Sequence, residues 1–345
     1  MSRELRVLIV DDSAYVRKVF KEMLSRCPDL LVVGTAADGD EALDAVERLQ
    51  PDVVTCDLIM PRSDGVDFIQ KQMAIRPIPI VVVSIASESS EQVLNALDAG
   101  ALDFVQKPTA LATEKIFEIA EDLVGKVRAA AGAPAGRLRV ASASPVRAPI
   151  TAAFHNRYDV VVIGVSTGGP QGLRVLIPQL AADFPVPVAI VLHMPVGYTE
   201  GYAKRLDQIS SLPVVEAHEG DEVRAGVVFV APAGRHLSFA RDPSGTVRCR
   251  LDISPLDTPH RPSADVLFQS AAEVYGDRVL AVVMTGIGDD GRQGAAWIKA
   301  RGGSVLTEAE ESCVVYGMPR SVVEAGLSDE SVPLERMAAA IVERV

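Results

Sequence analysis

Residues 164–170 read GVSTGGP and place three glycines around one serine, Ser166. An apolar run, Val160–Ile163, precedes this stretch, and a helix-like run, Gln171–Leu180, follows it. The order predicts a strand, a sharp turn and a helix, and in open α/β sheets ligands bind at the carboxyl ends of the strands. The stretch therefore predicts an α/β fold with a site at Ser166. That site is either a nucleophile in a G-x-S-x-G turn or a glycine-rich phosphate loop.

The rest of the chain repeats this alternation of short apolar runs and amphipathic stretches. In the C-terminal half the expected strands are Val160–Ile163, Val188–Leu192, Val227–Ala231, Val279–Met284 and Ser304–Thr307, and the expected helices are Gln171–Leu180, Gly201–Gln208, Ala264–Tyr275 and Gly291–Arg301. In the N-terminal half the expected strands are Arg6–Val10, Leu31–Thr35, Val53–Cys56, Ile80–Val83 and Phe104–Val105, and the expected helices are Ala14–Arg26, Glu41–Leu49, Gly65–Met73, Glu91–Ala99 and Thr113–Ala129. The pattern predicts two doubly wound parallel-sheet domains of the α/β class.

The composition narrows the class of protein. The chain has 345 residues, of which 48% are hydrophobic and 23% charged, and this predicts a globular protein of two or three domains. The net charge of −12 argues against a nucleic-acid partner. No apolar run approaches the roughly 18 residues that cross a bilayer, so no membrane insertion is expected. The four cysteines are scattered without a C-x-x-C pair, which is typical of a reduced, cytoplasmic chain.

A shift in composition separates the two halves. Residues 126–156 are rich in Ala, Pro, Gly and Ser, and no acidic residue occurs between Gly125 and Tyr158. This stretch is predicted to be a flexible linker of basic character between domains at residues 1–125 and 157–345.

Polar residues follow the strands of the N-terminal half where a site would form. They are Asp11, Asp12, Asp57, Ser84 and Lys107. Because the carboxyl ends of parallel strands share one edge, these side chains are expected to converge. Grouped carboxylates repel one another unless a cation lies among them, and their hard oxygens suit Mg²⁺. An aspartate held there can attack a phosphoryl donor, while the lysine and the hydroxyl hold phosphoryl oxygens.

A serine nucleophile at position 166 needs a base, and His193 is the best placed of the five histidines. It follows the expected strand Val188–Leu192, and so shares an edge with Ser166. Among the others, His155 lies in the linker, His218 is expected to face solvent, and His236 and His260 are expected in loops that could line a cleft. A triad also needs an acid, and residues 282–294, VVMTGIGDDGRQG, offer Asp289 and Asp290; spacing does not choose between them.

The sequence fits neither a standard α/β-hydrolase nor a dinucleotide site. In α/β-hydrolases the order along the chain is serine, acid, histidine, whereas here the histidine precedes the acid. A dinucleotide site would need an acidic residue about 20 positions beyond the glycine loop, where this chain has His193. The loop also lacks G-x-G-x-x-G spacing, so a hydrolase is favoured over an oxidoreductase.

The N-terminal half resembles a response-regulator receiver domain, which has a flavodoxin-like fold. The resemblance rests on VLIVDDS (7–13), CDLIMPRSDG (56–65), VVVS (81–84) and DFVQKP (103–108). It implies that Asp57 is phosphorylated and that Asp11, Asp12, Asp57 and the backbone carbonyl of Ile59 bind Mg²⁺. It also implies that Ser84 and Phe104 form the switch pair and that Lys107 contacts the phosphoryl group. Ile85 departs from the family, which usually has a second Ser or Thr there.

The whole chain resembles the chemotaxis protein-glutamate methylesterases of the CheB family, whose catalytic domain is Rossmann-like. The motifs are GVSTGGP, HMPVGYT (193–199), PSADVLFQSAA (262–272), MTGIGDDG (284–291) and ESCVVYGMPR (311–320). The resemblance implies hydrolysis of glutamyl methyl esters on chemoreceptors with release of methanol, and deamidation of receptor glutamines. It implies a chemotaxis histidine kinase as phosphodonor, a role in adaptation, and no cofactor for ester hydrolysis.

Residue roles follow from the same resemblance. Ser166 is the expected nucleophile, His193 the base and Asp290 the acid. The backbone N–H of Ile287 is expected to bind the oxyanion, and Thr167 to help hold the histidine. A signalling adaptor without catalytic activity is the alternative, and the intact set of Ser166, His193 and Asp290 favours the enzyme.

Overall fold

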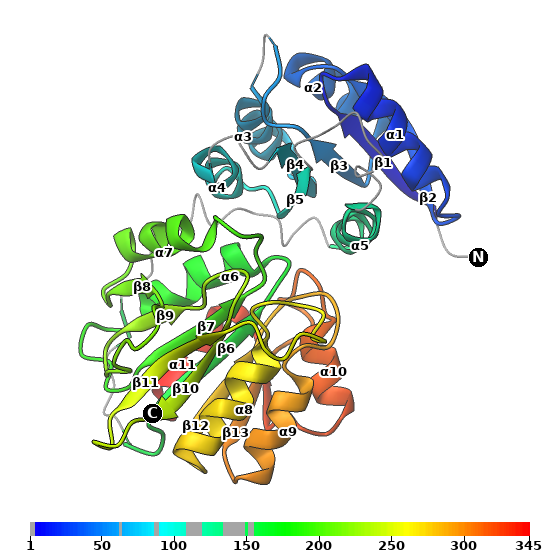
Figure 1. Ribbon diagram of the computed structural model, residues 1–345. Coiled ribbons are helices and arrows are strands. Elements are labelled where there is room, and N and C mark those ends of the chain that lie inside the picture. The colour runs from blue at the N-terminus through cyan, green and yellow to red at the C-terminus, as the bar shows by residue number, and fades with distance from the viewer. Residues whose placement is uncertain (1–3, 62–63, 86–89, 108–118, 134–148, 151–154) are drawn as a thin grey trace. The chain divides into compact units, whose positions relative to one another are not determined.

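The computed structural model describes residues 4–61, 64–85, 90–107, 119–133, 149–150 and 155–345. The chain divides into two compact units, Met1–Ala143 and Ser144–Val345. Each unit is built on its own parallel sheet (Figure 1). The predicted class, two doubly wound α/β domains, is confirmed.

The first unit contains a five-stranded parallel sheet in the order β2-β1-β3-β4-β5. Its strands are β1 (Leu5–Val10), β2 (Leu30–Ala36), β3 (Val53–Cys56), β4 (Ile80–Ile85) and β5 (Asp103–Lys107), and its helices are α1 (Ala14–Ser25), α2 (Gly39–Leu49), α3 (Gly65–Ile75), α4 (Ser90–Asp98) and α5 (Ala120–Ala131). This strand order is that of flavodoxin-like folds, in which ligands bind beside the carboxyl ends of β1 and β3.

The last helix of this unit extends further than expected. Helix α5 continues to Ala131, so the first six residues of the range predicted as linker are helical. Buried Val127 and Ala130 hold its last turns against the domain, and Arg128 pairs with Asp29. Residues 113–118 of the helix expected at Thr113–Ala129 lie outside the described residues.

The second unit contains a seven-stranded parallel sheet in the order β14-β13-β12-β6-β7-β9-β8. Its strands are β6 (Val160–Val165), β7 (Val188–Leu192), β8 (Val214–Glu216), β9 (Val228–Val230), β12 (Val279–Val283), β13 (Ser304–Glu308) and β14 (Glu330–Val332), and its helices are α6 (Gly169–Leu176), the short 3-10 helix η3 (Ile177–Gln179), α7 (Thr199–Gln208), α8 (Ala264–Tyr275), α9 (Arg292–Ala300), α10 (Met318–Glu324) and α11 (Leu334–Val342). All strands and helices predicted for this half are present.

The sequence did not predict the short edge strands β8 and β14, the helices α10 and α11, or an antiparallel hairpin. The hairpin strands are β10 (His236–Arg241) and β11 (Val247–Asp252). In β11 charged residues alternate with apolar ones, of which Val247 and Cys249 are buried, so the run VRCRLD is not apolar throughout. His236, which was expected in a loop, begins β10 and is buried.

The order of the strands fixes where the site forms. Strand β6 lies between β12 and β7, and the chain runs outward from β6 on the β7 side before returning to β12 on the other. The switch point therefore falls between the carboxyl ends of β6 and β12. Ser166 follows β6, residues 284–287 follow β12, and His193 follows β7.

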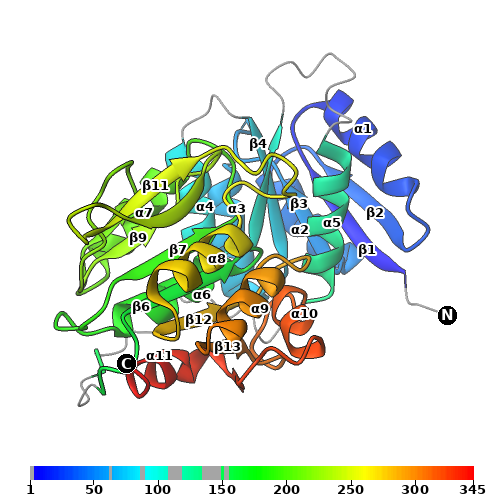
Figure 2. The ribbon, with the colours of Figure 1, turned by 60° about the horizontal axis from the view of Figure 1, so that its bottom comes forward.

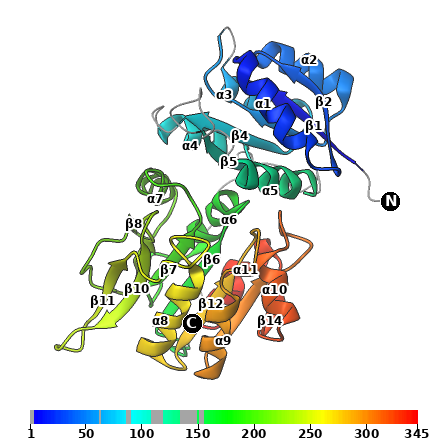
Figure 3. The ribbon, with the colours of Figure 1, turned by 45° about the vertical axis from the view of Figure 1, so that its right-hand side comes forward.

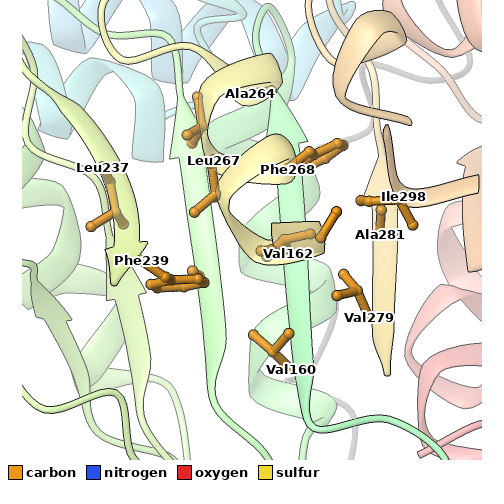
Figure 4. Close-up of a cluster of buried hydrophobic side chains, with 14 of the residues drawn as sticks. Val160, Val162, Leu237, Phe239, Ala264, Leu267, Phe268, Val279, Ala281 and Ile298 are labelled. Atoms are coloured by element: carbon orange, nitrogen blue, oxygen red, sulfur yellow. The ribbon is translucent and has the colours of Figure 1, made fainter. Parts of the chain in front are cut away.

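Helices cover both faces of this sheet. Helix α8 packs with α9 and α10 on one face, and α11 lies on the opposite side of the strands, where it contacts α6 (Figure 2; Figure 3). The core of the first face joins α8 to β6, β12 and the hairpin (Figure 4). Phe268 of α8 is fully buried there. No helix within the described ranges is long and apolar enough to cross a membrane.

Phe268→Ala is predicted to destabilise the second unit by about 3–5 kcal/mol, because it removes a ring from a closely packed core. The matched control is Trp297→Ala, since Trp297 on α9 is 42% exposed and should cost far less. Urea unfolding of the full chain measures both variants. Equal losses would show that α8 does not anchor the core.

Candidate active site and receiver site

The serine and the histidine lie at neighbouring positions beyond two paired strands. Val165 pairs with Leu192 at the ends of β6 and β7, and the His193 N–H donates to the Val165 carbonyl at 3.1 Å. Ser166 and His193 are therefore adjacent across the ladder. Beyond Ser166 the chain turns sharply at Gly168, whose φ of +80° favours glycine and which caps the start of α6.

His193 is bound to Asp290 through one nitrogen only. Its Nε2 lies 2.8 Å from Oδ2 of Asp290. A carboxylate only accepts hydrogen bonds, so Nε2 carries the proton and Nδ1 keeps its lone pair. Nδ1 is buried and has no hydrogen-bond partner among the described residues. The neutral imidazole therefore offers Nδ1 as a base, whereas in the best-known triads Nδ1 faces the acid.

Asp290 is held at the N-terminus of α8. Its carboxylate accepts from Ser263 Oγ at 2.8 Å, from Ala264 N at 2.7 Å and from Asp265 N at 3.0 Å. Burial alone would raise the pKa of Asp290, but the hydrogen bond from His193 and those from the backbone N–H groups of Ala264 and Asp265 outweigh it and hold that pKa well below its usual range. Asp290 is therefore an anion, stabilised by the helix terminus as well as by the imidazole.

Its neighbour Asp289 has a different environment. Asp289 is exposed and pairs with Arg292, the first residue of α9, at 2.7 Å. The acidic turn therefore sends one carboxylate to His193 and the other to solvent. The sequence left this choice open until the resemblance favoured Asp290.

The remaining histidines differ in their exposure to solvent. His260 is exposed and stacks on His193, with ring centroids 4.1 Å apart. His236 is buried: its Nδ1 accepts from Ser263 N at 3.2 Å and its Nε2 lies 3.1 Å from the Pro255 carbonyl. Burial lowers the pKa of His236, so it is a neutral structural group rather than part of a cleft lining. His218 is exposed, as expected.

The peptide between Gly286 and Ile287 lies directly beside the serine. A Cβ on Gly286 would come within 2.7 Å of Ser166 Cβ. The Gly286 carbonyl accepts from the N–H groups of Gly317 and Met318, at 3.1 and 2.9 Å. Because a trans peptide directs its C=O and N–H oppositely, the Ile287 N–H points away from the start of α10. Thr167 is buried, and its carbonyl accepts from Thr285 Oγ1 at 2.9 Å.

The sequence reasoning missed Glu308, the last residue of β13. It is fully buried, and its carboxyl accepts from Thr285 N at 2.9 Å and Ser312 Oγ at 3.0 Å. Burial, with Glu335 nearby, raises the pKa of Glu308 to about 7. A signal was present, because an acidic residue ends the apolar run SVLTE at the same sheet edge as Ser166.

In the first unit the predicted polar residues also converge. Lys107 Nζ lies 2.6 Å from Asp11 Oδ2 and 2.6 Å from Asp57 Oδ2, and all three side chains are largely buried. Carboxylate oxygens of Asp11, Asp12 and Asp57 lie within 4.8 Å of one another. Burial would lower the pKa of Lys107, but the two carboxylates raise it, so the lysine is charged.

The predicted switch residues flank this acidic group. Ser84 on β4 and Phe104 on β5 are both buried. The Phe104 carbonyl accepts from Lys126 Nζ of α5 at 2.7 Å. Ile59 is exposed two residues beyond Asp57, and its N–H donates to Asp57 Oδ1 at 3.4 Å.

The second unit thus has the parts of a serine hydrolase at the switch point of a doubly wound sheet, and the first has the acidic site of a phosphoacceptor domain. The comparisons agree with this class. The CheB methylesterase family model matches residues 161–341, and the response regulator receiver domain model matches residues 7–120. The chain belongs to the CheB methylesterase family.

Individual relatives span nearly the whole chain. A protein-glutamate methylesterase/protein-glutamine glutaminase of Myxococcus xanthus is 50% identical over 97% of this chain and 96% of its own length. One of Geobacter sulfurreducens is 42% identical over 99% and 98%. The crystal structure of the Thermotoga maritima CheB methylesterase catalytic domain is 43% identical, with a TM-score of 0.53, and covers 54% of this chain and 98% of that one.

Glu308→Gln is predicted to stabilise the protein more at pH 8 than at pH 5. The folded pKa of about 7 lies above the unfolded value of 4.5, so the unfolded state binds fewer protons between them and wild-type stability falls as pH rises through this window. Glutamine does not titrate. Urea midpoints at both pH values test this, with exposed Glu311→Gln as the control. A pH-independent difference between Glu308→Gln and wild type would contradict the raised pKa.

Proposed function

We propose that this protein is a phosphorylation-regulated serine hydrolase that demethylates glutamyl methyl esters on chemoreceptors and deamidates receptor glutamines. The observation that carries the proposal is the His193–Asp290 pair, which leaves Nδ1 of His193 as a free base beside Ser166. The family match and the names of the relatives supply the substrate class.

The proposed chemistry is acyl transfer to water. As Ser166 Oγ attacks the ester carbonyl, His193 Nδ1 takes its proton, and Asp290 stabilises the imidazolium that forms. The tetrahedral intermediate collapses, the methoxide leaves with the proton from His193, and methanol departs. His193 then takes a proton from water as it attacks the acyl-serine, and returns it to Ser166 Oγ as the glutamate is released. With a glutamine side chain the leaving group is ammonia.

Two neighbouring groups complete the proposed machinery. The Ile287 N–H is the proposed donor to the oxyanion, since its peptide lies beside Ser166 and is fixed by two hydrogen bonds to the Gly286 carbonyl. Thr167 is proposed to help hold the imidazole from its buried position between Ser166 and α6. Ester hydrolysis itself is proposed to use no cofactor.

The first unit is the proposed point of regulation. Asp57 is the proposed phosphoacceptor. The donor set of three close carboxylates fits Mg²⁺, which would be held by Asp11, Asp12, Asp57 and the Ile59 carbonyl, and which would supply charge neutralisation for phosphoryl transfer. Lys107 is proposed to contact the phosphoryl group, and its contact with Asp57 supports this role. Ser84 and Phe104 are the proposed switch residues.

The domain bounds, the partners and the location of the protein are proposed as well. We propose a receiver domain at residues 1–125, a linker at 126–156 that begins within the end of α5, and a methylesterase domain at 157–345. The proposed partners are methyl-accepting chemoreceptors as substrate and a chemotaxis histidine kinase as phosphodonor. The proposed location is the cytoplasm, where a histidine kinase would phosphorylate Asp57.

Ser166→Ala is predicted to reduce methanol release from methylated receptor by at least about 10³-fold, because no other group forms the acyl intermediate. The measurement compares purified full-length proteins at equal concentration. A mutant that kept a tenth of wild-type activity would overturn the assignment of the nucleophile.

Asp290→Asn is predicted to reduce kcat by about 10³–10⁴-fold, since an amide no longer fixes the tautomer that leaves Nδ1 free. Asp289→Asn is the matched control and should stay within about threefold of wild type, because Asp289 pairs only with exposed Arg292. Equal losses in the two variants would show that the wrong aspartate has been chosen.

Asp57→Asn is predicted to keep basal esterase activity but to lose its response to acetyl phosphate with Mg²⁺, because the acceptor carboxylate is gone while the second unit is unchanged. Methanol release with and without the phosphodonor measures this. A full response in the variant would place the phosphorylation site elsewhere.

A further inference from the structure

Thr285 joins the two sides of the site at the switch point. It follows β12 by two residues and is buried. Its carbonyl accepts from Ser166 N at 3.0 Å, and its Oγ1 donates to the Thr167 carbonyl at 2.9 Å. The same Oγ1 accepts from Val315 N at 2.9 Å. Thr285 thus binds both the backbone N–H of Ser166 and the backbone carbonyl of the next residue, Thr167.

Glu308 fixes Thr285 from the next strand. Strands β12 and β13 are paired, and Glu308 Oε2 accepts from Thr285 N at 2.9 Å. The other carboxyl oxygen, Oε1, accepts from Ser312 Oγ, and that hydroxyl also accepts from Leu334 N at the start of α11. The ionisable groups against Glu308 are Glu335 and the thiol of Cys313, whose Sγ lies 3.6 Å from the Glu308 carbonyl.

A buried carboxyl of this kind costs folding free energy, since the groups that act on it most strongly in the described part of the chain include no cation. The same position filled by an apolar side chain would leave the Thr285 N–H unpaired inside the protein. The role of the Glu308 carboxyl is therefore to accept the hydrogen bond of the buried Thr285 N–H.

We propose that Glu308 and Thr285 are positioning residues that anchor the chain after the end of β12. By doing so they fix the positions of Ser166 and of the Gly286–Ile287 peptide. This inference rests on the proposed esterase function. Neither residue contacts the reacting atoms; both act through the backbone. The chain of contacts runs from Glu308 through Thr285 to the N–H of Ser166, and from Thr285 to Gly286, which a second bond ties to Val315.

Displacement of a reacting group by about 1 Å can cost about 10²-fold in rate. Loss of the anchor should therefore lower kcat rather than raise KM, because its contacts run to the backbone of the nucleophile and of the proposed oxyanion donor.

Four variants of the full chain form matched pairs. Glu308→Leu and Thr285→Val remove the hydrogen bonds at nearly constant volume and are expected to lower kcat for methanol release by about tenfold or more, with KM within about threefold. Glu308→Gln keeps an oxygen that accepts from Thr285 N and adds an amide that can donate to Ser312 Oγ, and Thr285→Ser keeps the hydroxyl. Both conservative variants are expected to remain within about threefold of wild-type kcat.

A second measurement tests the positioning role without using the proposed receptor substrate. The rate at which a fluorophosphonate labels Ser166 reports the nucleophile without any receptor, and it should fall in Glu308→Leu and Thr285→Val in parallel with kcat. Wild-type protein that is labelled but releases no methanol would defeat the proposed function while leaving the labelling comparison valid.

Thermal unfolding of each variant shows whether it is folded at the assay temperature. If Glu308→Leu does not fold, Ser312→Ala takes its place. It removes the hydroxyl that donates to Oε1 and accepts from Leu334 N, leaves Glu308 and Thr285 in place, and is expected to slow labelling by about threefold. Unchanged labelling and kcat in every folded variant would overturn the positioning role. The positioning role would also be overturned if Glu308→Gln and Thr285→Ser lost as much labelling rate and kcat as Glu308→Leu and Thr285→Val.

Discussion

The buried carboxylate of Asp290 is the constraint on which the candidate active site depends. It accepts hydrogen bonds from the N-terminus of α8, from Ser263 and from His193, and so ties the loop after β12 to the loop after β7. An unpaired anion at this depth would be strongly unfavourable, so the contacts are obligatory for the fold as well as for the chemistry. They also decide which nitrogen of His193 is free, and with it the direction from which a proton can be taken.

Both units use the same geometric rule for different reactions. Parallel strands bring residues that are far apart in sequence to one edge, where Lys107 meets Asp11 and Asp57 in the first unit and His193 meets Asp290 in the second. The difference lies in the basic side chain that accompanies the acids. A lysine stays charged and can hold a phosphoryl group, whereas a histidine can give up its proton and act as a base.

Much of this could be predicted from the sequence because strand ends are visible as apolar runs. The ends of β6 and β7 placed Ser166 beside His193, and the ends of β1, β3 and β5 gathered the acids and Lys107. The choice between Asp289 and Asp290 did not follow from spacing, since adjacent residues in a turn point in different directions. The structure sends Asp290 to His193 and Asp289 to Arg292.

Other features depend on tertiary contacts that leave little local pattern. His236 was expected in a loop, yet it begins a hairpin strand and fixes the start of α8 through Ser263. Glu308 ends a buried strand, and its task becomes visible only once β12 lies beside β13.

The tautomer of His193 tests the central claim most directly. In ¹⁵N NMR spectra of protein labelled at histidine, compared with Asp290→Asn, the account predicts that neutral His193 carries its proton on Nε2 and a free lone pair on Nδ1. A wild-type His193 protonated on Nδ1 would contradict the account, because the group that must accept the proton of Ser166 would then already hold one.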